Sequence, residues 1–324
     1  MADSTVTYEQ LNDLSAEFDD AETELIRQDV IVKAPLYEKR QKLIAQIPNF
    51  WPLVFEQASP DIDEFIQPSD SSLLLNSLVN LTVSRFEIED GGKGDPRSLL
   101  FRFEFNENEH FEDKVIEKKF WQRKAKCGWT GLVSEPVEIQ WKKGKDLTGG
   151  LLGTVKKVWA ARQAQTKDAA SKASKDLTID ERALKKKIED TGLGSMSFFA
   201  WFGYVGHNVS AEESQEATET ARRERLSRQA GDETTDTNGA NDGGNDEDDH
   251  DDENELEIFP EGETLAIAIS EDLWPNAIKY FTQAQEQDEV SDDDFESEAG
   301  DEKEGEEETA YSDEEPPPAK RLKT

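Results

Sequence analysis

Residues 8–47 have the pattern of one long amphipathic helix. Apolar side chains recur along one face at heptad spacing, which is typical of a helix that packs against another helix. These apolar positions are Leu11, Leu14, Phe18, Ala21, Leu25 and Val32. A helix of about 40 residues is roughly 60 Å long, and a compact monomer cannot bury such a stripe. The stripe predicts a homodimer in which two copies of the helix pair; the alternative is an ordinary amphipathic helix folded on its own domain.

Pro35 lies inside this periodic stretch. A proline inside a helix removes one hydrogen bond and clashes with the preceding turn, at a cost of about 3 kcal/mol. The helix would therefore either stop near Lys33 or bend at the proline. Because Leu36 and Ile47 continue the helical rhythm beyond it, we expect a kink near Pro35 and a first unit that spans residues 1–47.

Acidic residues are concentrated in two segments of the 324-residue chain, whose formal net charge is −36. Residues 210–257 contain 18 Asp and Glu against four Arg, and residues 286–324 contain 17 against four Lys and Arg. Such polar segments cannot bury enough apolar surface to fold alone, so both are expected to be disordered. A polyanionic surface repels DNA and anionic lipid and attracts strongly basic proteins. We therefore expect a basic protein partner, no membrane association and no sequence-specific binding of nucleic acid.

The cellular location is also indicated by the sequence. Cys127 is the single cysteine, which rules out a disulfide within the chain and fits a reducing compartment. The N-terminus lacks the basic region and apolar core of a secretory signal, and no run approaches the ~18 apolar residues of a membrane-spanning helix. A basic cluster of Lys320, Arg321 and Lys323 follows three prolines and is typical of a nuclear import signal. The expected location is the nucleus, with shuttling to the cytoplasm left open.

After the long helix, the apolar pattern changes to the period of β-strands. Four strands are expected, within residues 79–88 (with a bulge near Ser84), 99–105, 114–122 and 137–141. Consecutive strands with short connections favour an antiparallel meander, and helices before and after it make the fold class α+β. The expected domain spans residues 48–285 and contains a four-stranded antiparallel sheet backed by helices.

Two insertions interrupt this expected domain. Residues 142–195 are lysine-rich and contain two segments with a helical pattern. A basic helix could contact nucleic acid; a solvated helix face and a fold-back onto the acidic segments are the alternatives. The second insertion is the acidic segment 210–257, predicted to be a disordered loop.

The sequence contains no recognisable catalytic or cofactor motif. The glycines at 91–94 and 149–153 lack the spacing of a phosphate-binding loop. The three histidines, His110, His207 and His250, have no partners at metal-ligand spacing, and one cysteine cannot make a zinc site. We therefore predict a protein that is not an enzyme and binds no cofactor or metal. A hydrolase would instead require a pocket with convergent polar groups.

Several segments together resemble the nucleosome assembly protein family, and in particular its SET-like branch. The matching segments are IPNFW at 47–51, FEFNENEHF at 103–111, EIQWKKGKDLT at 138–148, FFAWF at 198–202 and DLWPNAIKYF at 272–281. The resemblance covers roughly residues 8–148, 195–206 and 262–285. It implies a headphone-shaped dimer in which two long helices pair and each carries an earmuff domain. The lysine-rich and acidic insertions are longer here than in that pattern.

The resemblance also implies a function. It predicts a histone chaperone that binds core histones on the acidic underside of the earmuff and through its tail. The candidate histone-binding residues are Glu261, Glu263, Glu271 and Asp272 beside the matched Trp-Pro-Asn motif, and Asp292, Asp293 and Asp294 in the tail. The alternative implied function is regulation of another enzyme, either inhibition of a protein phosphatase or modulation of a histone acetyltransferase.

Overall fold

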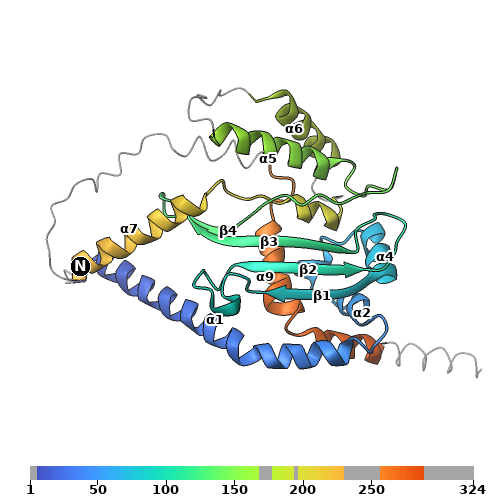
Figure 1. The fold of residues 1–324 in the computed structure, drawn as a ribbon, viewed down its shortest axis with the longest axis horizontal. Helices are drawn as coiled ribbons and strands as arrows, with labels where there is room; N and C mark the ends of the chain where they lie inside the picture. Colours follow the sequence, from blue (N-terminus) through green and yellow to red (C-terminus); the bar gives the residue numbers. More distant parts are fainter. Residues whose placement is uncertain (1–5, 168–176, 193–195, 230–255, 288–324) are drawn as a thin grey trace, which may run out of the picture.

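A four-stranded antiparallel sheet lies at the centre of the molecule, and a long helix runs along one side of it (Figure 1). The computed structural model describes residues 6–167, 177–192, 196–229 and 256–287. The strands are β1 (Leu78–Ser84), β2 (Leu99–Phe105), β3 (Val115–Lys124) and β4 (Thr130–Ser134), paired in that order. This confirms the predicted α+β meander. Within the described residues, no helix is long and apolar enough to cross a membrane.

The long helix α1 (Tyr8–Ile44) begins with a capping box in which Thr7 and Gln10 exchange hydrogen bonds. Each side chain accepts a hydrogen bond from the other residue's backbone N–H, which satisfies two free donors of the first turn. The helix continues unbroken through Pro35, and Figure 1 shows that it bends along its length. It ends at Ile44, three residues before the predicted end at Ile47, because residues 45–49 form turns.

Two of the predicted strands differ from the structure. The first strand ends at Ser84 instead of continuing to residue 88, and Phe86 packs edge-on against Trp121 outside the ladder. The predicted fourth strand at residues 137–141 is wrong, because there only Trp141 forms an isolated bridge, to Phe111. The fourth strand is β4, whose last four residues are all buried and so lack the alternation that marks a strand in sequence.

The core lies on one face of the sheet and is dominated by aromatic rings. Alternate residues of β2 are buried, as predicted, and the short 3₁₀ helix η3 (Phe198–Gly203) is buried along its whole length. Trp201 of η3 contacts Phe101 and Phe120 at ring-centroid distances of 5.1 and 5.3 Å. Burial of aromatic side chains in offset and edge-on geometry is a main source of stability. This cluster is therefore the body onto which the other elements pack.

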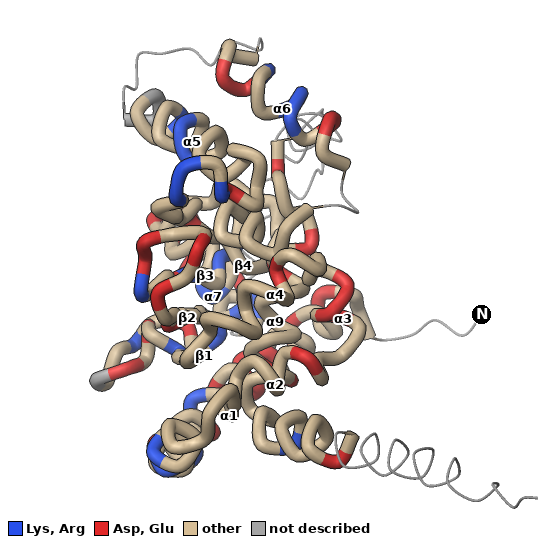
Figure 2. Tube along the Cα trace, turned by 90° about the vertical axis from the view of Figure 1, so that its right-hand side faces the viewer, with Lys and Arg blue, Asp and Glu red and all other residues tan. Residues whose placement is uncertain are grey.

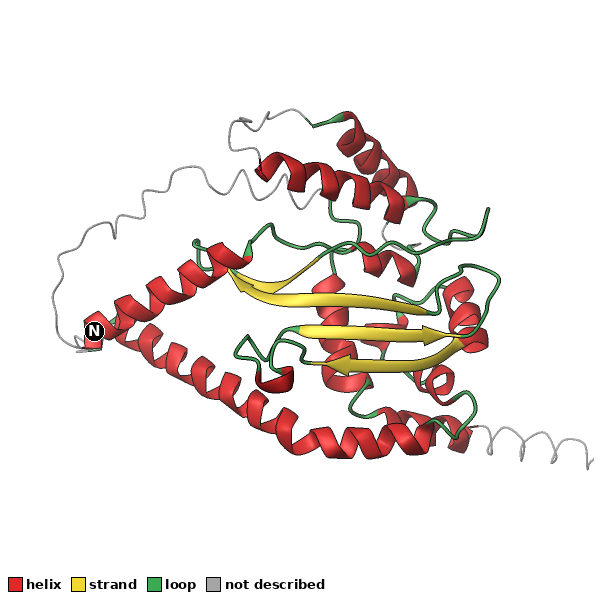
Figure 3. Cartoon of the chain, viewed as in Figure 1, coloured by secondary structure: helices red, strands yellow, loops and turns green. Residues whose placement is uncertain are grey.

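Short helices pack around the same core, and one of them crosses the sheet behind the strands (Figure 3). They are α2 (Phe50–Glu56), α3 (Pro60–Asp63), α4 (Pro68–Ser77), α9 (Gly262–Ala268) and the π-helical turn η4 (Ile269–Leu273), followed by a helix over residues 277–287. A single 3₁₀ turn, η1 (Glu89–Gly91), lies in the β1–β2 connection. The helices α3 and α4 each begin with a proline, which is tolerated in the first turn of a helix because its missing N–H would have no partner there.

Both insertions contain ordered helices. The lysine-rich insertion forms α5 (Leu151–Lys167) and α6 (Ile179–Thr191), which confirms its two helical segments; their apolar residues, including Leu151, Val155 and Leu184, join the core. Figure 2 shows Lys and Arg positions gathered along α5. The prediction that 210–257 is wholly disordered is wrong, because residues 211–229 form helix α7 (Ala211–Gln229). Residues 230–255 lie outside the described part of the chain.

Candidate functional site

The candidate residues Glu261 and Glu263 lie at the start of α9, beside the β4 edge of the sheet. Glu261 is the exposed N-cap residue, and its carboxylate accepts a hydrogen bond from the Thr264 hydroxyl at 3.0 Å. Glu263 is half-buried and accepts a hydrogen bond from the backbone N–H of Leu132 in β4 at 2.9 Å. Burial raises the pKa of Glu263. Glu261 is thus available to a partner, whereas Glu263 fastens α9 to the sheet.

Glu271 and Asp272 lie in η4, at the other end of the same helical segment. Glu271 is exposed, with an oxygen 3.8 Å from the Arg85 guanidinium just after β1. Asp272 accepts hydrogen bonds from the Tyr280 hydroxyl at 2.6 Å and the Asn276 amide at 3.0 Å. Burial and the Asp272 carboxylate raise the pKa of Tyr280 to about 12. Asp272 therefore holds the following helix in place, and Glu271 is the residue open to solvent.

The structure does not bring the four carboxylates into one cluster. Glu263 contacts β4 and Glu271 contacts the chain beyond β1, and these strands are the two opposite edges of the sheet. Helix α9 and η4 cross the sheet between them (Figure 1). Asp292, Asp293 and Asp294, together with Lys320, Arg321 and Lys323, lie outside the described residues. The described part of the candidate surface thus consists of two separated sites, marked by Glu261 and Glu271.

Glu271 also lines a groove of about 1010 Å³ between α1 and the β1 edge. Leu25, Tyr37 and Trp274 contribute apolar surface to it, and Asp29 is a further carboxylate on its wall. On the helix side, the groove runs along α1 from Leu25 to Lys42.

The six predicted dimer residues are all exposed on α1. The exposed fractions are 53% for Leu11, 49% for Leu14, 63% for Phe18, 66% for Leu25 and 68% for Val32, and Ala21 is also exposed. Apolar side chains of this size seldom form such a continuous exposed stripe unless it is an interface. The described residues of one chain leave the stripe uncovered, as the predicted pairing of two helices requires.

Sequence reasoning missed α7, which contacts the N-terminal half of α1. Arg225 lies 2.6 Å from an oxygen of Asp20, and Arg228 lies 2.7 Å from an oxygen of Asp13. The Arg228 guanidinium lowers the pKa of Asp13. Two signals could have predicted this helix: residues 211–229 contain neither Gly nor Pro, and Ser210 with Glu213 has the spacing of a helix start. The Ser210 hydroxyl accepts from the Glu213 N–H at 3.0 Å.

The C-terminal half of α1 is joined to the matched Trp-Pro-Asn motif through Arg40. Its side chain is 7% exposed, lies over the Trp274 ring at 4.4 Å and donates to the carbonyl oxygens of Trp274 and Pro275. Burial lowers the pKa of Arg40 to about 10. Cation–π contacts of this kind are stronger when they are shielded from water.

A buried lysine in β3 is a further charged group that the sequence did not predict. The Lys118 ammonium donates to the carbonyl oxygens of Glu135, Phe202 and Tyr204 at 2.6–3.0 Å. Burial lowers the pKa of Lys118 to about 7. Nearby, the Glu257 carboxylate accepts from the N–H groups of Val205, Gly206 and Phe259, and burial raises its pKa. The buried Lys118 ammonium and the Glu257 carboxylate thus each have backbone hydrogen-bond partners, which is sufficient reason for a structural role. Among the described residues, no group of three or more His, Cys, Asp or Glu could hold a metal ion.

Comparison with known proteins identifies a family and a fold. The family model described as Nucleosome assembly protein (NAP) matches residues 22–284. A putative nucleosome assembly protein of Schizosaccharomyces pombe is 35% identical over 150 residues, which cover 43% of this chain and 59% of that protein. Protein SET of Drosophila melanogaster is 35% identical over 128 residues, which cover 37% of this chain and 43% of that protein. The chain thus spans about half the length of these relatives.

A solved structure with a similar fold is the "Crystal Structure of the Vps75 Histone Chaperone". It has a TM-score of 0.50 and 22% sequence identity, and the alignment covers 86% of this chain and 98% of that one. This likeness supports the fold: a long N-terminal helix followed by a four-stranded antiparallel sheet with helices.

Proposed function

Because this chain belongs to the nucleosome assembly protein family, we propose that it is a histone chaperone that acts in nucleosome assembly in the nucleus. Family membership rests on the match to residues 22–284. The proposal agrees with the similarity in fold to Vps75, which is itself described as a histone chaperone. The observation that carries it is the combination of this family with two acidic segments in a chain of formal net charge −36.

The proposed mechanism is competition with DNA for the basic surface of histones. DNA binds cationic proteins largely through phosphate charge and the release of counterions. Carboxylates attached to a folded body bind the same Lys and Arg side chains reversibly and in a salt-dependent way. Each exposed ion pair contributes only ~0–1 kcal/mol, so affinity requires many pairs. The tail supplies many carboxylates for these ion pairs, and exposed carboxylates of the folded body, such as Glu261 and Glu271, supply some at fixed positions.

We propose that the working unit is a homodimer paired along α1. The exposed stripe from Leu11 to Val32 supports this proposal. Two copies of the acidic surface and two tails then act on one histone complex, which raises their effective concentration without new contacts.

The test is a salt titration of core-histone binding with the full chain and with a chain that lacks residues 286–324. Loss of the tail should weaken binding by about tenfold or more at ~0.15 M salt, because many weak ion pairs are lost together. A matched control carries a shuffled tail of the same composition, which should bind like the natural one. Equal affinity with and without the tail would refute its role.

Positional variants test the folded part of the surface. Replacing both Glu261 and Glu271 by Gln should weaken histone binding without changing thermal stability, because both side chains are exposed. Glu263→Gln should instead lower the stability of the domain, because its carboxylate fastens α9 to β4.

If histones stay unbound while a protein phosphatase or a histone acetyltransferase co-purifies, the alternative function as an enzyme regulator is favoured. Deleting residues 320–323 should reduce nuclear accumulation.

A further inference from the structure

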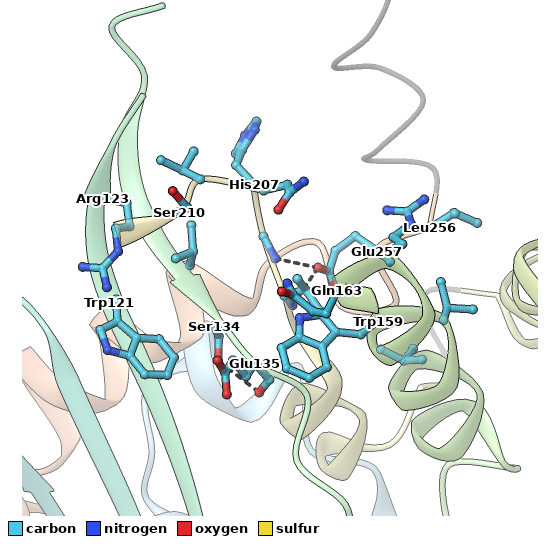
Figure 4. A pocket seen from close by; sticks show the side chains of 18 of the residues that line it. Trp121, Arg123, Ser134, Glu135, Trp159, Gln163, His207, Ser210, Leu256 and Glu257 are labelled. Atoms are coloured by element: carbon cyan, nitrogen blue, oxygen red, sulfur yellow. Dashed lines mark hydrogen bonds between the residues drawn. The ribbon is translucent and has the colours of Figure 1, made fainter. Parts of the chain in front are cut away.

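A cavity of about 500 Å³ lies at the β4 edge of the sheet, between β3 and β4 on one side and α5 and α6 on the other. The loop before α7 and residues 256–257 also line it (Figure 4). It is separate from Glu261 and Glu271, neither of which lines it. The proposed competition with DNA makes no use of this cavity.

Two tryptophans form opposite walls of this cavity. Figure 4 shows Trp121 of β3 and Trp159 of α5 on either side, with Ser134 and Glu135 between them. Trp121 is held in place because its ring packs edge-on against Phe86 at 5.9 Å. Both rings are only half-buried and line the cavity. The Arg123 guanidinium lies 6.0 Å from the centre of the Trp121 ring, so an entering side chain packs against the ring surface that Arg123 leaves open. Aromatic walls of this kind accept alkyl chains by packing and cations by their electron-rich faces.

The charges around the cavity favour a cationic occupant. Two arginines line it, but each is already paired: Arg123 lies 3.7 Å from Glu87, and Arg162 lies 2.8 Å from Glu181. Three carboxylates line the cavity, those of Glu135, Glu213 and Glu257, and none of them forms an ion pair within the part of the chain that the structure describes. The buried Lys118 ammonium attracts Glu135 and Glu257. An entering phosphate or carboxylate would meet the lining carboxylates, whereas an ammonium or guanidinium would be attracted by them.

We propose that this cavity receives a lysine or arginine side chain from an extended basic segment of a histone. The inference rests on the proposed chaperone function and adds a fixed docking point to it. The alkyl part of the side chain packs between the indoles of Trp121 and Trp159, and its charged end reaches the Glu135 carboxylate. A residue held in this way fixes the position of a bound basic segment, which many interchangeable ion pairs alone do not do.

Fluorine NMR of the full chain labelled with 5-fluorotryptophan tests this directly. The chain has seven tryptophans, and the variants Trp121→Phe and Trp159→Phe assign the two resonances of interest. The probe is a short Gly-Ser peptide with a central arginine flanked by lysines. Its counterpart carries citrulline at the centre, which has nearly the same shape and no charge. The arginine peptide should shift the Trp121 and Trp159 resonances and leave that of buried Trp201 unchanged.

Variants separate the cavity from general electrostatic attraction. Glu135→Gln should weaken binding of the arginine peptide by about fivefold, the effect of losing one charged contact of ~1 kcal/mol. The matched control Glu56→Gln removes the same charge from an exposed position at the end of α2, outside the cavity, and should change nothing. Unchanged resonances, equal binding of the citrulline peptide, or equal weakening by both variants would each overturn the proposal.

Binding of intact core histones, measured with the same proteins, tells the two proposals apart. If histones bind but the peptide leaves Trp121 and Trp159 unchanged, the docking point is wrong and the chaperone function stands. If histones do not bind the natural chain at ~0.15 M salt, the chaperone function itself is wrong. A peptide that shifts both resonances while histones fail to bind would confirm the cation site and assign it to a different basic partner.

Discussion

The two halves of α1 meet their surroundings in different ways. In the C-terminal half, Tyr37 packs on Trp274 at 4.3 Å, Arg40 is 7% exposed and Ile44 is 5% exposed. In the N-terminal half, Leu11 and Leu25 are more than half exposed. There Arg225 and Arg228 of α7 pair with Asp20 and Asp13 of α1, and Figure 1 shows that the start of α1 approaches the end of α7. One continuous helix is therefore part of the domain at one end and a free surface at the other.

The two halves of α1 are therefore stabilised by different kinds of contact. Burial of apolar and aromatic surface contributes several kcal/mol per large side chain, whereas exposed ion pairs contribute little. The C-terminal half is held by the first kind of contact and stays with the domain in a single chain. The apolar stripe of the N-terminal half stays exposed in a single chain, and we expect the α1 helix of a second copy to cover it. Substitutions in the two halves should consequently affect different properties.

The largest expected effect on folding is at the docked half. Arg40→Met keeps the alkyl chain but leaves the carbonyl oxygens of Trp274 and Pro275 without their donor. It should lower the free energy of unfolding by about 3 kcal/mol, because buried polar groups lose a charged partner. Lys39→Met is the matched control at an exposed neighbouring position and should have almost no effect. Urea unfolding followed by circular dichroism measures both, and equal stability of the two variants would contradict the comparison.

The next effect concerns assembly and is expected only in the free half. Leu25→Asp places a charge in the predicted seam between two α1 helices. Its burial should raise the dissociation constant of the dimer about a hundredfold, or ~3 kcal/mol, and leave unfolding of the monomeric domain unchanged.

Analytical ultracentrifugation over a concentration series measures the dimer. Asn12→Asp is the control, because it adds the same charge to α1 at an exposed position outside the apolar stripe. A dimer that survives Leu25→Asp unchanged would place the interface elsewhere.

Pro35 lies between the two halves, and its replacement tests whether they are mechanically linked. Pro35→Ala supplies the N–H that can bond to the Ile31 carbonyl and removes a ring from a helix interior. We expect a gain of ~1 kcal/mol in the free energy of unfolding and slower amide exchange around residue 35. A loss of stability would show that the bend is needed for the C-terminal half to reach Trp274.

Much of the fold could be predicted from residue patterns, and the misses have physical causes. Residues 99–105 alternate because one face of β2 packs on the aromatic core and the other does not. Strand β4 has no such signal, because Gly131 to Ser134 are all buried. Residues 137–141 imitate a strand in sequence, since Ile139 is buried and both Val137 and Trp141 pack against the core without joining the ladder. Alternating burial is thus not by itself evidence of strand pairing.

The candidate surface was less predictable than the fold. Four carboxylates close in sequence were expected to act together, but the segment that carries them crosses the sheet and separates Glu261 from Glu271. Sequence also cannot distinguish an exposed carboxylate from one such as Glu263, whose hydrogen bond comes from a residue 131 positions away in the chain. The cavity between Trp121 and Trp159 could not be predicted either, because β3 and α5 meet only in the folded protein.

The smallest expected effect concerns the contact of α7 with the free half of α1. Arg225→Gln with Arg228→Gln removes the ion pairs to Asp20 and Asp13. Arg222→Gln with Arg223→Gln is the matched control, with the same loss of charge at exposed positions of the same helix. Because exposed ion pairs are weak and screened by salt, the domain should unfold as before, and only the tip of α1 should become more mobile.

Hydrogen–deuterium exchange of residues 8–24 should accelerate by about threefold at low salt, and the difference from the control should shrink as salt is added. An equal acceleration in both pairs would show that α7 acts on α1 through its net charge alone, whereas no acceleration in either would mean that the apolar stripe, once paired, already fixes the free half.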